Sequence, residues 1–329
     1  MYANAVIRGD CREVAGEFAR LCGVRQGMPD LALLRTLTRE FGRLPYENFT
    51  KVLRAAGHED PLQRLRTPEV VLSEHLERGA GGTCFSLTHF FRRVLEFFGF
   101  DAAPVLCDRS YGPGTHCALI VRAGCARFLV DPGYLMQEPI EIPEHGASLQ
   151  RGLQGALTLT RLGRSSQLLL ISESEGGKKI RYRLRDRPVS DEEFLARWID
   201  SFEWPMMRHL CVSRQTAEGQ LYMRDGRVRR VRGGDRNQVR LGSDFAEEVE
   251  RAFGVDRRLV SMARDALATI RNVALTQRFG CSSQRGSRRP DTAAYKYRPT
   301  KAPDETASEA RRDSEKNTRS VASVDIKGR

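Results

Sequence analysis

The sequence lacks the features that mark several large classes of protein. It has no run of about eighteen or more apolar residues, so no segment is expected to span a membrane. Residues 1–8 lack the apolar core of a signal peptide, and no internal repeat is present. We therefore expect a cytoplasmic protein, whose 329 residues suffice for two or three packed layers or small domains.

The eight cysteines show no regular spacing, and no two of them form a Cys-x-x-Cys pair. Neither a zinc site nor a disulfide framework is therefore expected. In a reducing cytoplasm most of these thiols should be small buried apolar side chains. Cys117 and Cys125 are both expected in the core. Only Cys84 stands in a context that indicates reactivity.

The net charge of +12 arises partly from residues 282–329 and partly from an arginine-rich run at 224–232. A basic chain suits an anionic partner such as coenzyme A, an acyl carrier protein or a nucleic acid. No nucleic-acid-binding motif is present, and aromatic residues are not interleaved with the basic ones. Nucleic acid is therefore not expected as the main partner.

Three short segments carry the residues of a thiol nucleophile. Cys84 opens an amphipathic pattern of helical spacing, and His116 and Asp131 stand at the edges of strand-like runs. A helix N-terminus and a neighbouring imidazolium both stabilise a thiolate, which is the reactive form of cysteine. An aspartate behind the imidazole fixes its tautomer and balances its charge. We therefore predict Cys84 as nucleophile, His116 as base and Asp131 as the residue that orients His116.

The segments around these residues resemble the arylamine N-acetyltransferase family. Its hallmark Arg-Gly-Gly-x-Cys-Phe, Thr-His and Val-Asp-x-Gly segments correspond to residues 81–85, 115–116 and 130–133. Two flanking segments, at 44–49 and 211–219, are similar to the family's Pro-Phe-Glu-Asn and Gln-Thr-x-Asp/Glu-Gly segments. The resemblance implies an α+β fold with an N-terminal helical bundle, a central antiparallel β-barrel and a C-terminal α/β lid around a cysteine-protease-like core.

The sequence departs from the family pattern close to the cysteine. Ala80 stands where relatives carry an arginine, and Ser86 and Thr88 replace the usual acidic residue and asparagine. If that arginine and acid pair with each other in relatives, their joint absence is a compensated loss. Removal of one partner alone would leave an uncompensated buried charge. These departures place the acceptor substrate in question.

Periodicity along the chain agrees with an α+β arrangement, because helical patterns come first, strands follow and a mixed part ends the chain. We predict a helical bundle over 1–100 with Cys84, a barrel over 101–187 with His116 and Asp131, a lid over 188–279, and a disordered basic tail over 280–329. Within this division we predict helix through most of 10–78, strands near 102–107, 116–122, 126–131, 155–160, 166–172 and 180–185, a helix at 190–203, hairpins at 210–241 and helices at 244–253 and 256–273.

The resemblance implies acetyl transfer from acetyl-CoA through an acyl-Cys84 to an arylamine, hydrazine or related amine, in a ping-pong mechanism. Acetyl-CoA would be a co-substrate, and no cofactor would be permanently bound. In the family the threonine that matches Thr216 contacts coenzyme A. Three alternatives stay open: an amide synthase that uses a carrier-bound polyketide thioester, a transglutaminase-like or peptidase-like hydrolase, and a non-catalytic relative kept for binding.

Overall fold

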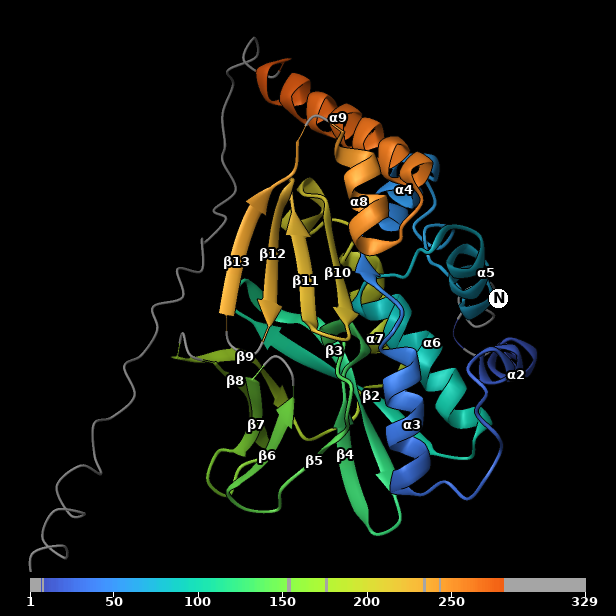
Figure 1. The fold of residues 1–329 in the computed structure, drawn as a ribbon, viewed down its shortest axis with the longest axis vertical. Coiled ribbons are helices and arrows are strands. Elements are labelled where there is room, and N and C mark those ends of the chain that lie inside the picture. The colour runs from blue at the N-terminus through green and yellow to red at the C-terminus, as the bar shows by residue number, and fades with distance from the viewer. Residues whose placement is uncertain are drawn as a thin grey trace, which may run out of the picture. The chain divides into compact units, whose positions relative to one another are not determined.

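The first hundred residues form helices that surround one central helix (Figure 1). The computed structural model describes residue 7 and residues 9–152, 155–174, 177–232, 235–242 and 244–280. In this region the elements are α2 (Arg12–Leu21), α3 (Leu31–Phe41), β1 (Tyr46–Glu47), α4 (Phe49–Gly57), α5 (Pro68–Arg78) and α6 (Cys84–Phe97). α6 is the central helix, since ten of its fourteen residues are buried and α2, α3 and α5 pack on it.

An eight-stranded antiparallel sheet follows in the chain and curves into a nearly closed barrel. Its strands are β2 (Asp101–Arg109), β3 (Gly112–Ala123), β4 (Ala126–Val130), β5 (Ile140–Glu141), β6 (Ala147–Gly152), β7 (Gly155–Arg161), β8 (Gln167–Ser174) and β9 (Gly177–Arg185), with the 3-10 helix η1 (Pro132–Tyr134) after β4. The spatial order is β5-β4-β3-β2-β9-β8-β7-β6. β3 alone has nine buried residues, which makes it the strand that joins the barrel to α6.

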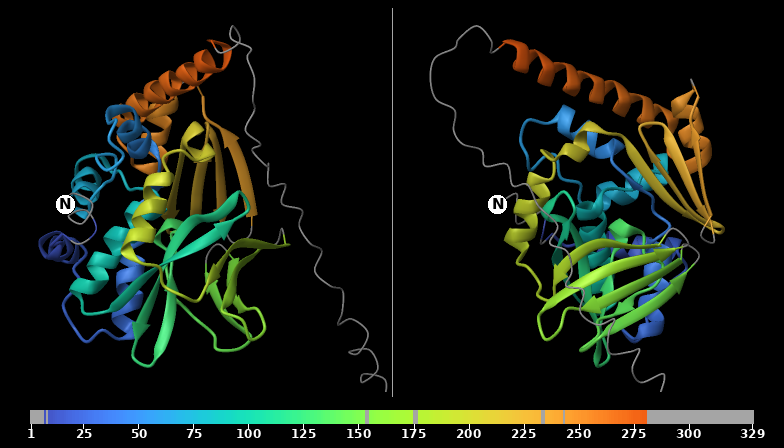
Figure 2. Two further views of the ribbon diagram at one scale, coloured as in Figure 1. Left: turned by 180° about the vertical axis from the view of Figure 1, so that it is seen from behind. Right: turned by 90° about the vertical axis from the view of Figure 1, so that its left-hand side faces the viewer.

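The third group of elements builds a second antiparallel sheet (Figure 1, orange strands). It comprises α7 (Asp191–Asp200), η2 (Pro205–Arg208), β10 (Cys211–Thr216), β11 (Gly219–Arg224), β12 (Arg227–Arg232), β13 (Asp235–Arg240), α8 (Phe245–Phe253) and α9 (Arg257–Gly280). β1 joins this sheet at the edge of β10, so the order is β1-β10-β11-β12-β13. α9 packs along both α4 and α8, as the views in Figures 1 and 2 show.

Buried apolar residues gather in three clusters that correspond to these groups. Phe18, Phe41, Phe90 and Phe91 lie in the cluster between the N-terminal helices and β2–β4, where their rings pack at 4.4–5.6 Å. A second cluster fills the barrel. A third joins Phe85 to the inner face of the second sheet and to α8 and α9. The start of α6 therefore lies where two of the clusters meet, since Phe85 belongs to the third and Leu87 to the first.

The α+β fold class is confirmed, and most predicted elements are present within a few residues of their expected bounds. The prediction of helix through 10–78 missed β1, because Tyr46 and Glu47 are extended by pairing with Ser213 and Val212, far along the chain. β5 and β6 were also missed. Met1–Gly280 forms one compact unit, and the division at 100, 187 and 279 stays a prediction. The predicted tail lies, from residue 281 onward, outside the described residues.

Within the described residues, no helix is both long enough and apolar enough to cross a bilayer.

Candidate active site

The turn before α6 places Cys84 at the first position of the helix. Thr83 precedes it in an extended conformation and makes no side-chain cap hydrogen bond. The amide of Glu47 donates to the carbonyl of Gly82, and the amide of Gly82 donates to the carbonyl of Pro45 at 3.3 Å. A Cβ at Gly81 would lie 1.7 Å from that same Pro45 oxygen, so only glycine permits the close approach. The turn is thus locked to the 45–47 segment.

His116 and Asp131 form a buried pair at the edge of the barrel. His116 lies on β3 and Asp131 directly follows β4, with Nε2 of the histidine 2.6 Å from Oδ2 of the aspartate. The second oxygen, Oδ1, accepts from the amide of Tyr134 at 2.8 Å. The Tyr182 ring packs against the imidazole, with centroids 5.1 Å apart. The aspartate is therefore fixed from two sides, and it fixes the imidazole in turn.

Gly133 shows that the cysteine and the histidine meet. A Cβ built on this glycine would lie 2.7 Å from Cβ of Cys84, 2.9 Å from its Cα and 3.0 Å from Cε1 of His116. Both side chains therefore border the same small space, which the missing side chain of Gly133 leaves free. The structure brings together the three residues predicted from the sequence, although they come from three separate elements.

The charges at this site favour a thiolate beside an imidazolium. Hydrogen bonding to the Cys117 thiol, together with hydrogen bonding to His116 and its charge, holds the pKa of Cys84 well below its usual range, although burial acts the other way. Burial lowers the pKa of His116, but the charge of Asp131 and the hydrogen bond to it outweigh this, and the pKa rises to about 9. The imidazole is thus protonated near neutral pH.

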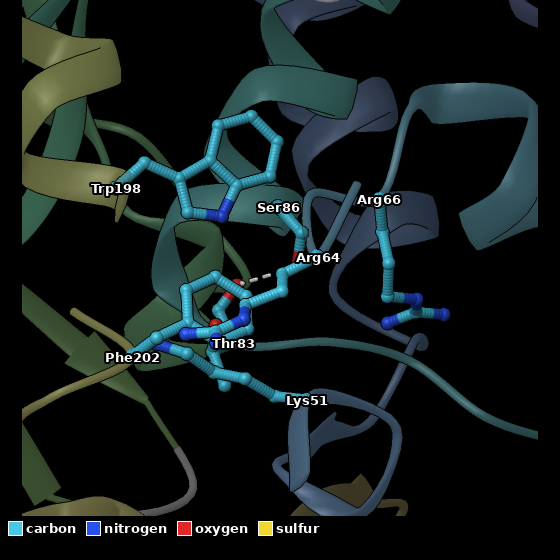
Figure 3. A pocket seen from close by; sticks show the side chains of 7 residues that line it. All are labelled: Lys51, Arg64, Arg66, Thr83, Ser86, Trp198 and Phe202. Atoms are coloured by element: carbon cyan, nitrogen blue, oxygen red, sulfur yellow. Dashed lines mark hydrogen bonds between the residues drawn. The ribbon is translucent and has the colours of Figure 1, made fainter. Parts of the chain in front are cut away.

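A buried lysine lies near the same helix start. Nζ of Lys51 donates to the carbonyl of Ser201 at 2.9 Å and lies 4.6 Å from the centre of the Phe202 ring. Burial lowers the pKa of Lys51 to about 8. Lys51 borders a cavity of about 10 Å³, large enough for about one water molecule, together with Thr83 and Ser86 on either side of the cysteine (Figure 3). Its charge is one of the influences that lower the pKa of Cys84.

Comparison with known proteins identifies the family of this chain. A family model described as N-acetyltransferase matches residues 30–257, which is more than half of the chain. The chain belongs to the arylamine N-acetyltransferase family. It is thus a member of an enzyme family of acyltransferases.

Solved structures of arylamine N-acetyltransferases share the fold. The Mycobacterium abscessus enzyme has 20% sequence identity and a TM-score of 0.67, over 79% of this chain and 99% of that one. The Salmonella typhimurium enzyme has 19% identity and a TM-score of 0.64, over 78% and 98%. The Mycobacterium marinum enzyme, solved in complex with CoA, has 15% identity and a TM-score of 0.64, over 77% and 96%. A sequence comparison with curated proteins gives no match.

The missing family arginine at position 80 has a counterpart elsewhere in the chain. Ala80 is fully buried, and the guanidinium of Arg66 lies close to the next residue, since its Nη1 donates to the carbonyl of Gly81 at 2.7 Å. Arg66 also lies 3.7 Å from the carboxylate of Glu47 and 2.5 Å from that of Glu74. The departure from the family pattern at Ala80 therefore does not leave the turn before Cys84 without a cation.

The other two departures are filled by small hydroxyl groups. Oγ of Ser86 donates to the carbonyl of Thr83 at 3.1 Å, one turn back at the helix start. Thr88 is buried and lies 3.5 Å from the thiol of Cys117. Neither position carries a charge, so neither needs an ionic partner.

Thr216, the residue matched to the family's coenzyme A contact, lies in the second sheet. It ends β10, where its hydroxyl donates to the carbonyl of Gly219 at 3.2 Å and accepts from the amide of Glu218. Its neighbour Gln215 donates to the carbonyl of Leu135, just after η1, at 2.9 Å. The strand that carries Thr216 is therefore tied to the loop that carries Asp131.

Several residues of the site were missed by sequence reasoning. Tyr182, Lys51 and Arg66 are buried around the triad but come from segments without a motif. The absence of arginine at position 80 was the one signal that could have prompted a search for Arg66. The prediction for Cys125 was wrong, because the β3–β4 turn exposes it, whereas Cys117 is buried beside Cys84.

Among the side chains that the structure describes, no group of three or more His, Cys, Asp or Glu is placed to hold a metal ion.

Proposed function

We propose that acetyl-CoA acetylates Cys84 and that the acetyl group then passes to an arylamine, a hydrazine or a related amine. The observation that carries this proposal is the helix-start cysteine of lowered pKa beside a buried, hydrogen-bonded His116–Asp131 pair. Family membership supplies the reaction class, and the CoA complex of the Mycobacterium marinum relative supports the choice of donor.

In the first half-reaction the Cys84 thiolate attacks the thioester carbonyl carbon of acetyl-CoA. A carbon–sulfur bond forms to the enzyme, and the bond to the coenzyme sulfur then breaks. The departing coenzyme A thiolate takes the proton of the His116 imidazolium. Asp131 keeps the imidazole oriented while it loses that proton, because its carboxylate is itself fixed by the Tyr134 amide.

In the second half-reaction the amine attacks the carbonyl carbon of acetyl-Cys84. The neutral His116 accepts the amine proton, and Cys84 leaves as a thiolate. The ion pair of the resting enzyme is thereby restored. Since burial and Asp131 together set the pKa of His116 to about 9, the imidazole returns to its protonated form between turnovers.

The start of α6 supplies partners for the negative oxygen that forms in both steps. The first backbone N–H groups of a helix have no partner within the helix, and Thr83 does not cap them with its side chain. Such groups stabilise an oxyanion when they point at it. Thr216 is retained as a proposed contact of the donor. A reducing compartment such as the cytoplasm would suit a reactive thiol, so that location stays a prediction.

Intact-mass analysis after incubation with acetyl-CoA tests the proposal. In the absence of an amine, the wild-type protein should gain the mass of one acetyl group, and Cys84→Ser should not form a turnover-competent adduct. Cys125→Ser is the matched control, because Cys125 is the exposed one among the cysteines that the structure describes, where nonspecific acetylation is expected.

An unmodified wild-type mass at saturating acetyl-CoA would contradict the proposed donor. Acetylation from a thioester of an acyl carrier protein would then identify an amide synthase, the first of the alternatives above. Failure with both donors would favour a non-catalytic relative.

A further inference from the structure

One face of the second sheet is covered, and the other carries a row of arginines. Val212, Leu221 and Met223 point toward α8 and α9 and belong to the buried cluster there. Side chains alternate along a strand, so Tyr222 and Arg224 lie on the opposite face. Arg229 pairs with Tyr222, and Arg227 pairs with Arg224, so they share this second face.

A cavity of about 540 Å³ opens on this second face. That volume lies within the usual range for small-molecule sites, about 300–1,000 Å³. Its lining includes four arginines, a tyrosine and a glutamine: Arg224, Arg227, Arg229, Arg240, Tyr222 and Gln238. The guanidinium of Arg229 lies over the Tyr222 ring, 5.2 Å from its centre, in a cation–π contact.

The positive charge in this cavity is largely uncompensated. The acidic residue of the lining, Asp225, pairs with His209 at 2.5 Å and lies 3.9 Å from Arg224. Among side chains that the structure describes, no carboxylate forms an ion pair with Arg227, Arg229 or Arg240, and Nε of Arg229 is buried without a hydrogen-bond partner. Uncompensated guanidinium groups that converge in a cavity select a multiply charged anion, and phosphate matches their geometry best.

Strand register connects this cavity to the nucleophile. Gly82 bridges to Tyr46, Tyr46 pairs with Ser213, Ser213 pairs with Tyr222, and Tyr222 pairs with Arg229. Neighbouring strands lie about 4.8 Å apart, so Arg229 is roughly 15 Å from Tyr46 across the sheet. This line of paired residues begins at Gly82, two residues before Cys84, and ends at Arg229, one of the arginines.

The same length separates the two ends of a pantetheine thioester. Its chain has thirteen bonds between sulfur and phosphorus, slightly more than the twelve bonds of four residues of extended backbone, which span roughly 14 Å. From Gly82 to Arg229 there is one strand spacing more, roughly 19 Å in all. The long arginine side chains can reach back over that last spacing, so a donor whose thioester meets Cys84 can bring its phosphate groups to them if the pantetheine arm follows the paired residues from Tyr46 to Tyr222.

We propose that the arginines at 224, 227 and 229 bind the phosphate groups of the acyl donor's nucleotide, with its base beside Tyr222. This inference rests on the proposed function for the identity of the donor. It places the nucleotide at the end of the β10–β11 hairpin where Cys211 pairs with Arg224, which replaces the contact proposed above for Thr216 at the other end, where that residue pairs with Gly219. The two ends are five residues apart along the strands, roughly 16 Å.

The test compares donors with and without the nucleotide. In Arg227→Gln/Arg229→Gln, the KM for acetyl-CoA in Cys84 acetylation should rise at least tenfold. With S-acetylpantetheine, which has neither phosphate nor adenosine, the wild type and the variant should react equally well. Arg230→Gln is the matched control, because Arg230 lies on the same strand but pairs with Leu221 on the opposite face. This control should behave as wild type, and all three proteins should have the same melting temperature.

Calorimetric binding of adenosine 3′,5′-bisphosphate gives a readout that needs no catalysis. The wild type should bind it, and the double variant should bind at least tenfold more weakly. If Cys84 is never acetylated, the proposed function fails, whereas this binding still decides the phosphate site. Equal affinity in wild type and variant would overturn the inference, and so would a defect seen only with a carrier-protein thioester, which would assign the arginines to a protein partner.

Discussion

Nη1 of Arg66 donates a 2.7 Å hydrogen bond to the carbonyl of Gly81, three residues before Cys84. The same atom donates to Oγ1 of Thr50 at 2.9 Å, and Thr50 in turn donates to the carboxylate of Glu47. The side chain of Arg66 is 4% exposed. One buried cation therefore joins the turn that presents the nucleophile to the 45–50 segment beneath it.

Replacement of Arg66 by methionine should destabilise the protein and slow Cys84. Removal of one partner of a buried ion pair leaves the other uncompensated, here Glu47, which is fully buried, and the cost is about 3–5 kcal/mol. The turn also loses its hydrogen bond at Gly81, so Cys84 is held less firmly. Urea unfolding measures the first effect, and the rate of alkylation by iodoacetamide measures the second.

Two variants separate this role from a general loss of charge. Arg64→Met removes a cation from the same loop, but Arg64 contacts the carbonyls of His58 and Glu59 and the carboxylate of Glu203. It should alter alkylation of Cys84 by less than twofold. Arg66→Met/Glu47→Gln should recover part of the lost stability, because no uncompensated charge remains at Glu47. Equal alkylation rates in Arg66→Met and wild type would refute the positioning role.

Sequence motifs found the residues proposed to be catalytic but not those that support them. Cys84, His116 and Asp131 each stand in a local pattern that the family shares, so spacing along the chain was enough. Arg66 acts on Gly81 across fifteen residues of sequence, and its effect depends on a close approach that no local pattern encodes. β1 was missed for the same reason, because its extended backbone depends on pairing with β10.

A methyl group at Gly133 should strongly reduce activity while the fold survives. The Cβ of Gly133→Ala would meet Cβ and Cα of Cys84 at 2.7 and 2.9 Å, and backbone atoms cannot move aside as a flexible side chain does. Overpacking of this kind costs about 1–3 kcal/mol. A displacement of Cys84 from His116 by about 1 Å can cost about a hundredfold in rate. We expect a loss of that size in acetyl transfer, measured as kcat with a saturating amine.

Gly57→Ala provides the control for this change. No atom lies within 4 Å of a Cβ at Gly57, and its φ is not in the left-handed region, so alanine should fit at the end of α4 without strain. Both variants should show a native circular dichroism spectrum. An active Gly133→Ala enzyme would mean that Cys84 and His116 do not need their present separation.

The arginine cavity shows a different limit of sequence reasoning. The run at 224–232 was evident as an excess of positive charge, and an anionic partner was inferred from it. Alternation along the strands decides which of these arginines face the same side, and the pairing of β11, β12 and β13 brings Arg240 to them from further along the chain. Neither the face nor the cavity follows from composition.

The pH dependence of acetylation should depend on Asp131. The charge of Asp131 raises the pKa of His116 to about 9 against the effect of burial. A raised pKa means that the imidazolium is present below about pH 9 and is lost as the pH rises through that value. Because coenzyme A leaves with the imidazolium proton, the rate of Cys84 acetylation should decline above about pH 9. In Asp131→Asn the opposing burial remains without the carboxylate, so the decline should begin at least one pH unit lower, with at least about a twofold loss at pH 8. Rapid-mixing mass analysis of acetyl-Cys84 from pH 6 to 10 measures both curves.

Asp101→Asn removes an exposed carboxylate from the same sheet and should leave the pH profile of acetylation unchanged. A profile for Asp131→Asn that coincides with wild type would show that His116 does not depend on Asp131 for its charge.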